Sequence, residues 1–251
     1  AATIEIDEFG EVTRIGYTGD IGRSNNYLLR APDAFPQCDY LIVESTYGDR
    51  LHQNKQLSEA ELLRIIKHTC IDKKGKLIIP SFAIGRTQEI VYILNNFYNE
   101  KKLPFIPVYV DSPLAIEATG IFLQCDQSCF DEETTALVKQ GINPIWFDDI
   151  CLSVTSDESK QINFDKRPKV ILSASGMCEA GRIRHHLKHN LWGEENTILF
   201  VGYQAEGSLG RKLQDGAQYV RLFGEDITVN AEIAALHGTS GHADQAGLIQ
   251  W

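Results

Sequence analysis

The rhythm of apolar and polar positions changes along the chain, and each rhythm predicts a kind of element. Near the start, apolar residues alternate with polar ones on both sides of Phe9-Gly10. That alternation predicts two strands around a turn over residues 3–17. The compact apolar run at 40–43 predicts a buried strand.

Beyond residue 50, apolar runs of strand length alternate with segments of helical spacing. The first predicted helix, 57–71, begins near Ser58, which has Glu61 three residues later in the spacing of a capping box. Predicted strands follow at 76–80, 106–110, 151–154, 169–173, 197–202 and 218–223. Further predicted helices lie at 86–100, 114–124, 132–140, 156–163, 181–192 and 208–215, and an extended piece at 227–235 precedes a final helix. This alternation predicts the fold class α/β, with a mostly parallel sheet flanked by helices.

Small or polar residues follow five of the predicted strands. They are Glu44-Ser45-Thr46, Ser81-Phe82-Ala83, Asp111-Ser112-Pro113, Ser173-Ala174-Ser175-Gly176 and Gly202-Tyr203-Gln204. In an open α/β sheet, ligands bind beyond the carboxyl ends of the strands. We therefore expect these five strand ends to line one crevice.

Composition and charge narrow the class of protein. Of 251 residues, 43% are apolar and 23% are charged, which fits a globular protein with a sizeable core. No apolar run approaches the ~18 residues that a membrane helix requires, so we expect no membrane partner. The six cysteines include no C-x-x-C pair, and we expect them to be reduced in a cytoplasmic protein. The net charge of −10 argues against a nucleic-acid partner, unless a local basic strip or bound cations reverse the sign at one site.

Three segments contain acids or histidines with candidate chemistry. Asp20 lies on a tight turn after a predicted strand, where an aspartate either bridges two metal ions or bonds its own backbone. Glu44 ends a predicted strand, as a functional acid or as the cap of a turn. His242 lies in the loop 237–244, whose two histidines suit metal binding or proton transfer, although a structural histidine is the commoner case. Asp244 is also a candidate N-cap for the final helix.

Basic and small residues at predicted helix starts are candidates for phosphate contacts. His185 and His189 share a helical face at a spacing that zinc can use, but we favour a solvated basic face or a phosphate contact for the segment 182–189. The serine-rich turn before it would present backbone N–H groups to a phosphate. The segments 85–89 and 207–211 open helices in a similar way, with helix capping as the simpler interpretation.

Taken in order, several segments resemble the β-CASP branch of the metallo-β-lactamase-fold nucleases, which are RNA-processing enzymes. Thr18-Gly19-Asp20 resembles the motif whose aspartate bridges two zinc ions. Glu44-Ser45-Thr46-Tyr47-Gly48 resembles the first β-CASP motif, and Ser240-Gly241-His242-Ala243-Asp244 resembles the second. Other similar segments are 80–89, 111–113, 175–177 and 202–210. The match covers nearly the whole chain, and its order and number make it specific.

The resemblance implies a β-CASP domain at residues 49–238, with partial metallo-β-lactamase-fold segments at 1–48 and 239–251. It implies a zinc-dependent ribonuclease, of endo- or 5′-exonuclease action, with two zinc ions and single-stranded RNA as substrate. A homodimer or an RNA-processing complex is compatible with it. Asp20 would be a metal ligand and catalytic residue, His242 a proton donor or phosphate ligand, and Glu44 would orient His242. The residues that would hold RNA phosphates are Ser81, Arg86, Ser112, Ser175, Gly176, Arg182, Arg184 and Ser208.

The chain departs from the family pattern in its metal ligands. The family's His-x-His-x-Asp-His motif and the histidine of the third β-CASP motif do not occur in these 251 residues, which leaves Asp20 as the remaining family ligand. Because zinc takes about four ligands, we expect the 251 residues alone to be inactive and not to retain the two ions. The start at Ala1 without methionine and the end at Trp251 within a helical pattern lead us to expect a piece of a longer protein.

Two other functions remain open on the sequence alone. One is an RNA-binding or partner-binding module without catalysis, and the other is an unrelated doubly wound enzyme that acts on a nucleotide or sugar phosphate. A His-rich metal motif in the native gene would exclude the first. A small closed pocket at the carboxyl edge of the sheet would favour the second, because a nuclease needs an open groove.

Overall fold

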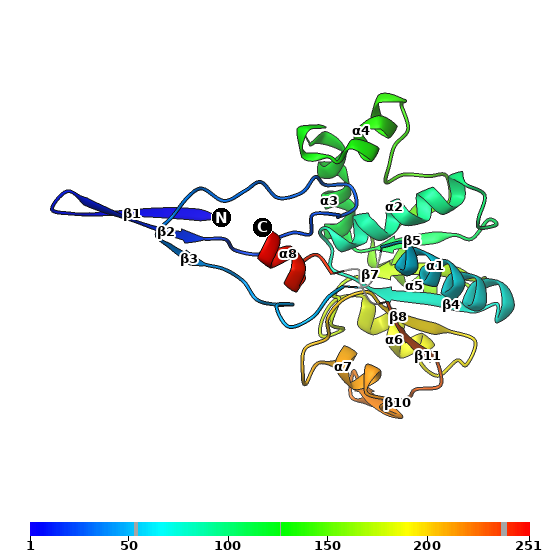
Figure 1. Ribbon diagram of the computed structural model, residues 1–251. Helices are drawn as coiled ribbons and strands as arrows, with labels where there is room; N and C mark the ends of the chain where they lie inside the picture. The colour runs from blue at the N-terminus through cyan, green and yellow to red at the C-terminus, as the bar shows by residue number, and fades with distance from the viewer. Residues whose placement is uncertain (53–54, 126, 237–239) are drawn as a thin grey trace.

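A parallel β-sheet built from the short apolar runs of the sequence lies at the centre of the molecule (Figure 1). The computed structural model describes residues 1–52, 55–125, 127–236 and 240–251. Within them, six parallel strands lie in the order β11-β8-β4-β7-β5-β6. Their bounds are β4 Lys76–Pro80, β5 Val108–Asp111, β6 Ile150–Leu152, β7 Lys169–Ser173, β8 Thr197–Phe200 and β11 Glu232–Ala235. The predicted α/β class is confirmed.

Alternate residues of the central strands face two separate cores. In β4, Leu77 and Ile79 pack into one core, and Ile78 packs into the other. The register places Ile78 beside Ile171 of β7 and Ile198 of β8, so one apolar layer runs across three strands. A strand covered on both faces has no polar side, which is why its sequence reads as a continuous apolar run.

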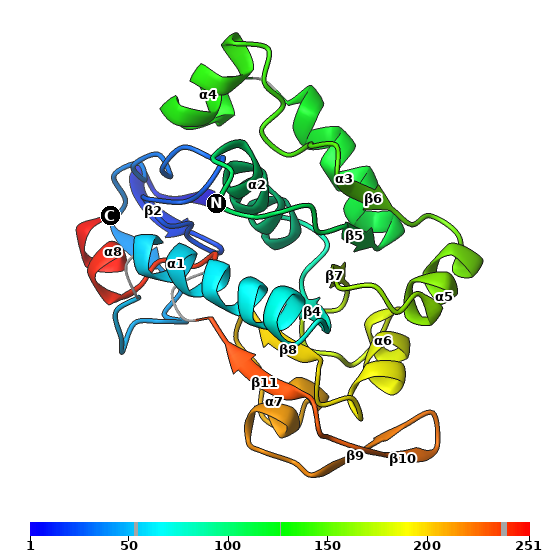
Figure 2. The ribbon, with the colours of Figure 1, turned by 90° about the vertical axis from the view of Figure 1, so that its right-hand side faces the viewer.

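Helices cover both faces of this sheet. The helices α1 (Lys55–Ile66), α2 (Arg86–Asn99) and α3 (Pro113–Gln124) contribute side chains to the first core, and α5 (Ser156–Phe164), α6 (Ile183–Asn190) and α7 (Leu209–Gln214) contribute to the second. Figure 2 shows α1 and α2 on one side of the line of strands and α5 and α6 on the other. The remaining helical segments are a π-helix at Lys67–Asp72, a 3-10 turn at Gln127–Cys129, α4 (Glu132–Lys139) and α8 (Gln245–Gln250).

The capping box predicted at Ser58 is wrong. Helix α1 begins at Lys55, so Ser58 lies inside the helix and is buried, and Glu61 forms an ion pair with Arg64 one turn later. The box does occur at α5, where the Thr155 hydroxyl accepts from Glu158 N–H and the Glu158 side chain accepts from Thr155 N–H. A capping pattern therefore marks a helix start only where the preceding residues are not themselves helical.

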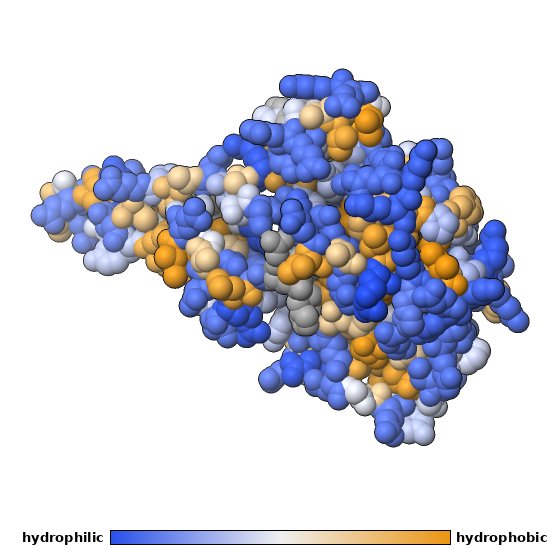
Figure 3. Space-filling model, turned by 45° about the vertical axis from the view of Figure 1, so that its right-hand side comes forward, coloured by the Kyte–Doolittle hydropathy of each residue, from blue (hydrophilic) through white to orange (hydrophobic). Residues whose placement is uncertain are grey.

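The first three strands form a second sheet that projects from the body of the molecule (Figure 1). Strands β1 (Ala2–Glu8) and β2 (Glu11–Tyr17) form the predicted hairpin, and β3 (Tyr40–Ile42) pairs in parallel with β2. The prediction that 40–43 is buried is wrong, because all four residues are exposed. The cause is that the residues of this three-stranded sheet are mostly exposed, so β3 is not covered by a second apolar layer. Figure 3 shows apolar patches along this projecting arm.

The predicted strand 218–223 does not join the parallel sheet. Strand β9 (Tyr219–Leu222) turns at Phe223-Gly224, where both residues have positive φ, and pairs antiparallel with β10 (Glu225–Thr228). The predicted extended piece 227–235 thus divides into β10 and the sheet strand β11. Among the described residues, none of the helices combines the length and apolar character that a membrane crossing requires.

Candidate active site

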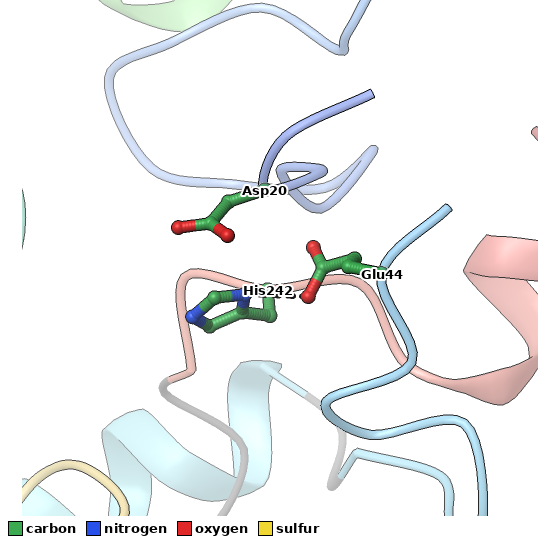
Figure 4. Close-up of side chains that lie close together, drawn as sticks. All are labelled: Asp20, Glu44 and His242. Carbon is green, nitrogen blue, oxygen red and sulfur yellow. Dashed lines mark hydrogen bonds and ion pairs between the residues drawn. The ribbon is translucent and has the colours of Figure 1, made fainter. Parts of the chain in front are cut away.

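Three segments that are far apart in the sequence meet beside the end of the second sheet. Asp20 follows β2, Glu44 follows β3, and His242 lies in the loop before α8. Ligand atoms of these three side chains lie within 4.8 Å of one another (Figure 4). The structure therefore brings together the three residues that the sequence singled out as catalytic, while their roles remain predictions.

Backbone contacts fix this meeting point. Gly19 has a φ of +62°, a conformation that glycine adopts without strain, and this turns the chain sharply between β2 and Asp20. Thr18 N–H donates to the carbonyl of Ile42 at 3.1 Å, which joins the ends of β2 and β3. Ala243 N–H donates to the carbonyl of Ile21 at 2.8 Å, which brings the His242 loop against the same turn.

Glu44 is held as an ionised acceptor. Its Oε1 accepts from the backbone N–H of Ile21, and its Oε2 accepts from the Thr46 hydroxyl at 2.6 Å and lies 2.8 Å from Nδ1 of His242. Burial would raise the pKa of Glu44, but the hydrogen bonds from Thr46, Ile21 and His242 outweigh it and lower the pKa. Because an ionised carboxylate can only accept, Nδ1 of His242 donates, and Nε2 is the ring nitrogen left for a ligand.

Two residues hold the loop that carries His242: Asp244, which the sequence analysis singled out, and His52, which it missed. Asp244 is the N-cap of α8, as expected, with Oδ1 accepting from Gly247 N–H at 2.9 Å, and its Oδ2 accepts from His52 N–H at 2.9 Å. Nε2 of His52 in turn donates to the carbonyl of His242 at 3.0 Å, and the edge of the ring meets Tyr47. Burial lowers the pKa of His52, which favours the neutral tautomer that makes this bond. Nothing in the spacing of His52 distinguishes it from a surface histidine.

A cavity of about 750 Å³ opens directly onto this cluster. Asp20 and His242 form part of its wall, together with the ion pair of Arg86 and Glu89, whose nearest atoms are 2.5 Å apart. Arg86 is 10% exposed, so its guanidinium is nearly enclosed. Burial raises the pKa of Glu89, although Arg86 opposes this.

Most of the residues predicted to hold phosphates are engaged elsewhere in the structure. Ser112 and Ser208 accept from backbone N–H groups as N-caps of α3 and α7, and the Ser81 hydroxyl bonds Thr87 in the interior. Arg182 donates to Asp111 and to the carbonyls of residues 153 and 154. Arg86 is the member of the predicted set that lines the cavity with His242.

The other three predicted phosphate residues lie on or near the loop after β7. Ser175 accepts from Ala180 N–H at 3.4 Å, which is at the long limit for a hydrogen bond. Gly176 packs against the ring of Phe82, and Arg184 donates to the carbonyl of Glu179 at 3.0 Å. Contact of these residues with a phosphate stays a prediction.

Comparison with known proteins identifies the family. The family model of the Beta-Casp domain matches residues 87–213, and that of the Zn-dependent metallo-hydrolase RNA specificity domain matches residues 226–251. The chain belongs to the β-CASP family of metallo-β-lactamase-fold proteins. It is 37% identical over 96% of its length to the ribonuclease TTHA0252 of Thermus thermophilus, of which the match covers 55%. The chain is 36% identical over its whole length to an RNase J-like protein of Methanocaldococcus jannaschii, and the match covers 57% of that protein. It is also 36% identical, over 94% of its length, to transcription termination factor FttA of the same organism, and this match covers 38% of FttA.

The chain thus spans about half the length of two of these relatives and less of the third. Family membership sets aside the alternative of an unrelated doubly wound enzyme. The boundaries expected at residues 48 and 238 enclose the Beta-Casp match, but they stay a prediction. Of the five strand ends expected in one crevice, those after β4, β5, β7 and β8 lie at the carboxyl edge of one sheet. Glu44 follows β3, which belongs to the other sheet, so the expectation of a single sheet edge is wrong for that residue.

Asp20 and His242 can supply part of the ligand set of the metal centre that a β-CASP hydrolase needs. Asp20 and His242 offer a carboxylate and an imidazole, which are ligand types that zinc binds. Among the described residues, neither the Asp20 carboxylate nor Nε2 of His242 has a hydrogen-bond partner, whereas both oxygens of Glu44 are occupied. Within the described residues, the carboxylate of Asp20 and Nε2 of His242 are therefore available as ligands, whereas Glu44 holds His242 in place.

Proposed function

We propose that the protein containing this chain is a metal-dependent nuclease that uses zinc to hydrolyse phosphodiester bonds of single-stranded RNA in the cytoplasm. The observation that supports this most directly is the meeting of Asp20, Glu44 and His242 at the wall of a large cavity. The names of two relatives, a ribonuclease and an RNase J-like protein, point to the same chemistry. In this proposal residues 49–238 hold the RNA against the metallo-β-lactamase-fold part.

Each of the three residues has a separate role in the proposal. Asp20 is a ligand of the zinc centre, which when bound lowers the pKa of a water molecule and stabilises negative charge on the phosphate. His242 presents Nε2 to the cavity, where it holds a phosphate oxygen or gives a proton to the leaving oxygen. Glu44 keeps Nδ1 of His242 protonated and fixes the plane of the ring, as a carboxylate does for many catalytic histidines.

Separate measurements of metal content and of RNA cleavage test these roles in the full-length protein. We expect Asp20→Ala to lose both bound zinc and activity. We expect His242→Ala to keep the zinc and lose cleavage of a single-stranded RNA by at least 10²-fold, which is the usual contribution of a positioned acid. His189→Ala is the control, because this histidine lies on α6 and is absent from the cavity wall.

Two results would contradict the proposal. Full activity of His242→Ala would remove its catalytic role, and unchanged zinc content of Asp20→Ala would remove the metal ligand. The 251 residues alone are expected not to cleave RNA when zinc is added, because the described residues place three candidate ligands in the cluster and zinc takes about four. Cleavage by the isolated chain would overturn that expectation.

A further inference from the structure

Two aromatic side chains in the cavity wall are left exposed by the fold. Phe82 is 50% exposed and Tyr203 is 53% exposed, and both line the cavity that Asp20 and His242 also line. Phe82 follows β4 and Tyr203 follows closely after β8, and these strands are neighbours in the sheet. The two rings therefore stand on adjacent loops at the same edge. A half-exposed aromatic ring leaves apolar surface in water, which a flat apolar partner would cover.

Phe82 is held as a fixed platform. Its carbonyl accepts from both the N–H and the hydroxyl of Thr87, at 3.3 and 2.7 Å, so the loop cannot swing away from α2. One edge of its ring lies against Gly176, where an added Cβ would stand 3.0 Å from Cε2 of the ring. A larger residue at position 176 would displace the ring, so the glycine is needed for close packing here.

A buried glutamine couples the two aromatic loops. Gln204 is buried beside Tyr203, and its amide nitrogen donates to the carbonyls of Gly176 at 2.9 Å and Gly202 at 3.2 Å. The loop that supports Phe82 and the loop that carries Tyr203 are thereby tied to each other. Loops held in this way lose little conformational entropy when their side chains bind a ligand, which favours affinity.

Positive charge lies on the far side of Tyr203. A second cavity of about 290 Å³ shares Tyr203 with the first and is lined by Arg50 and Arg211. Arg50 is exposed and pairs with Asp49 at 2.7 Å, and Arg211 is partly exposed and pairs with Asp215 at 2.8 Å. Exposed ion pairs contribute little, so these guanidinium groups can exchange their partners for phosphates. The two cavities thus place flat apolar surface and anion-binding groups side by side, as a single strand of nucleic acid requires.

We infer that Phe82 and Tyr203 stack on unpaired bases of single-stranded RNA and so hold the nucleotides beside the phosphate that is cleaved. This inference rests on the proposed ribonuclease function, and it identifies the part of the substrate that the apolar wall recognises. Stacking on a ring face is tolerant of base identity, because every base has a π-face. The cavity therefore binds single strands with little sequence preference, whereas stacking inside a duplex would hide the base faces that the rings need.

The test compares two ligands in the full-length protein that carries His242→Ala, so that the ligand is not consumed. One ligand is a short single-stranded oligoribonucleotide, and the other is an abasic ribose-phosphate chain of the same length. We expect Phe82→Ala and Tyr203→Ala each to raise Kd for the RNA by about 30-fold, the middle of the range for base–aromatic stacking, and to leave Kd for the abasic chain unchanged. Phe82→Tyr keeps a ring face and is expected to keep the original Kd for RNA.

Matched controls are available on the same molecule. Phe105, 73% exposed on the loop leading into β5, and Tyr219, 65% exposed in β9, are aromatic residues outside both cavities. Their alanine variants are expected to leave both Kd values unchanged. An equal loss for RNA and abasic chain in Phe82→Ala, or no loss for either, would overturn the inference.

The outcomes also separate the inference from the function on which it rests. Base-dependent binding without hydrolysis by the unmodified full-length protein would refute the proposed function and leave stacking supported. Hydrolysis of RNA together with equal binding of the two ligands would refute stacking and leave the proposed function standing.

Discussion

The carboxylate of Asp111 is fully buried at the end of β5, and both of its oxygens meet donors. Oδ1 accepts from Arg182 at 2.8 Å, and Oδ2 lies 2.6 Å from both the Ser159 hydroxyl and Nε2 of His186. Burial would raise the pKa of Asp111, but the hydrogen bonds from His186 and Ser159 hold it at about 2. The fold therefore keeps an ionised group in its interior.

The partners of His186 place an acceptor beside each of its ring nitrogens. Nδ2 of Asn190 donates to the carbonyl of His186 and to Oδ1 of Asn163, so Asn163 presents its oxygen to Nδ1 of His186. Nε2 lies 2.6 Å from the carboxylate of Asp111. Asp111 thus accepts from the buried ring of His186 and compensates the charge of the partly buried Arg182.

Replacing Asp111 by Asn should leave the guanidinium of Arg182 uncompensated and weaken the hydrogen bond with His186. Removing one partner of a buried pair typically costs about 3–5 kcal/mol, and we expect that loss in the free energy of unfolding measured with urea. The matched control is Asp157→Asn on α5, whose ion pair with Lys160 is largely exposed and contributes less than about 1 kcal/mol. A loss in Asp111→Asn no larger than in the control would refute this reasoning.

The pH dependence gives an independent value for the same interaction. The folded-state pKa of about 2 lies below the ordinary 3.8, so the stabilisation is present above about pH 4 and is lost as the pH falls toward 2. At 1.36 kcal/mol per pKa unit, this shift corresponds to about 2 kcal/mol. The difference in unfolding free energy between the original protein and Asp111→Asn should therefore shrink by about this amount across that window. A constant difference down to pH 2 would contradict the assignment.

Three further predictions address other parts of the molecule. Glu44→Gln should lower RNA cleavage by the full-length protein by about 10–100-fold at unchanged thermal stability, because His242 loses its fixed acceptor; full activity would contradict this. Gly75→Ala should reduce the unfolding free energy by at least about 2 kcal/mol, because the added Cβ would stand 1.8 Å from the carbonyl oxygen of Glu195. The control is Gly120→Ala in α3, whose Cβ would meet no atom within 4 Å and which should stabilise the fold by about 0.5–1 kcal/mol. Equal effects of the two substitutions would be inconsistent with the packing. A thiol reagent, with the products identified by mass spectrometry, should label the exposed Cys125 and Cys129 first. Cys70 and Cys178 should be labelled only upon unfolding, because burial raises the pKa of both thiols to about 12. Early labelling of Cys70 would argue against its burial.

The parallel sheet could be predicted from the sequence because burial on both faces leaves a direct trace. The run 76–80 is apolar after its first residue since Leu77, Ile78 and Ile79 face cores on alternate sides, and its predicted and observed bounds agree. The run 40–43 is also apolar but lies exposed in the projecting sheet. Composition reports that a segment can be buried, and the presence of a covering layer decides whether it is.

The meeting of Asp20, Glu44 and His242 could be predicted from the sequence, whereas the hydrogen-bond partners of the serines at helix starts could not. Asp20, Glu44 and His242 belong to motifs whose residue types and order are specific. Ser112 and Ser208 each precede a helix. The free N–H groups at a helix start can bond either to a phosphate or to the hydroxyl of the preceding serine, and the sequence is the same in both cases. In the structure both serine hydroxyls accept from N–H groups of their own helices, and their contact with a phosphate stays a prediction. The spacing of Phe82 and Tyr203 in the sequence shows no periodicity that predicts a shared cavity.

The net charge of −10 is compatible with RNA binding if stacking supplies much of the affinity. Each phosphate contact to a single strand contributes about −0.7 to the slope of log K against log salt, and the two cavities offer Arg50, Arg86 and Arg211 as contacts. We therefore expect a shallow slope of about −2 for RNA binding by the full-length His242→Ala protein, measured by anisotropy over a range of salt concentrations. Arg50→Gln should reduce the magnitude of the slope by about 0.7, whereas Phe82→Ala should lower the affinity at every salt concentration without changing the slope. A much steeper slope would mean that charge on other surfaces dominates binding, and a slope altered by Phe82→Ala would show that the ring acts through the arginines rather than through the bases.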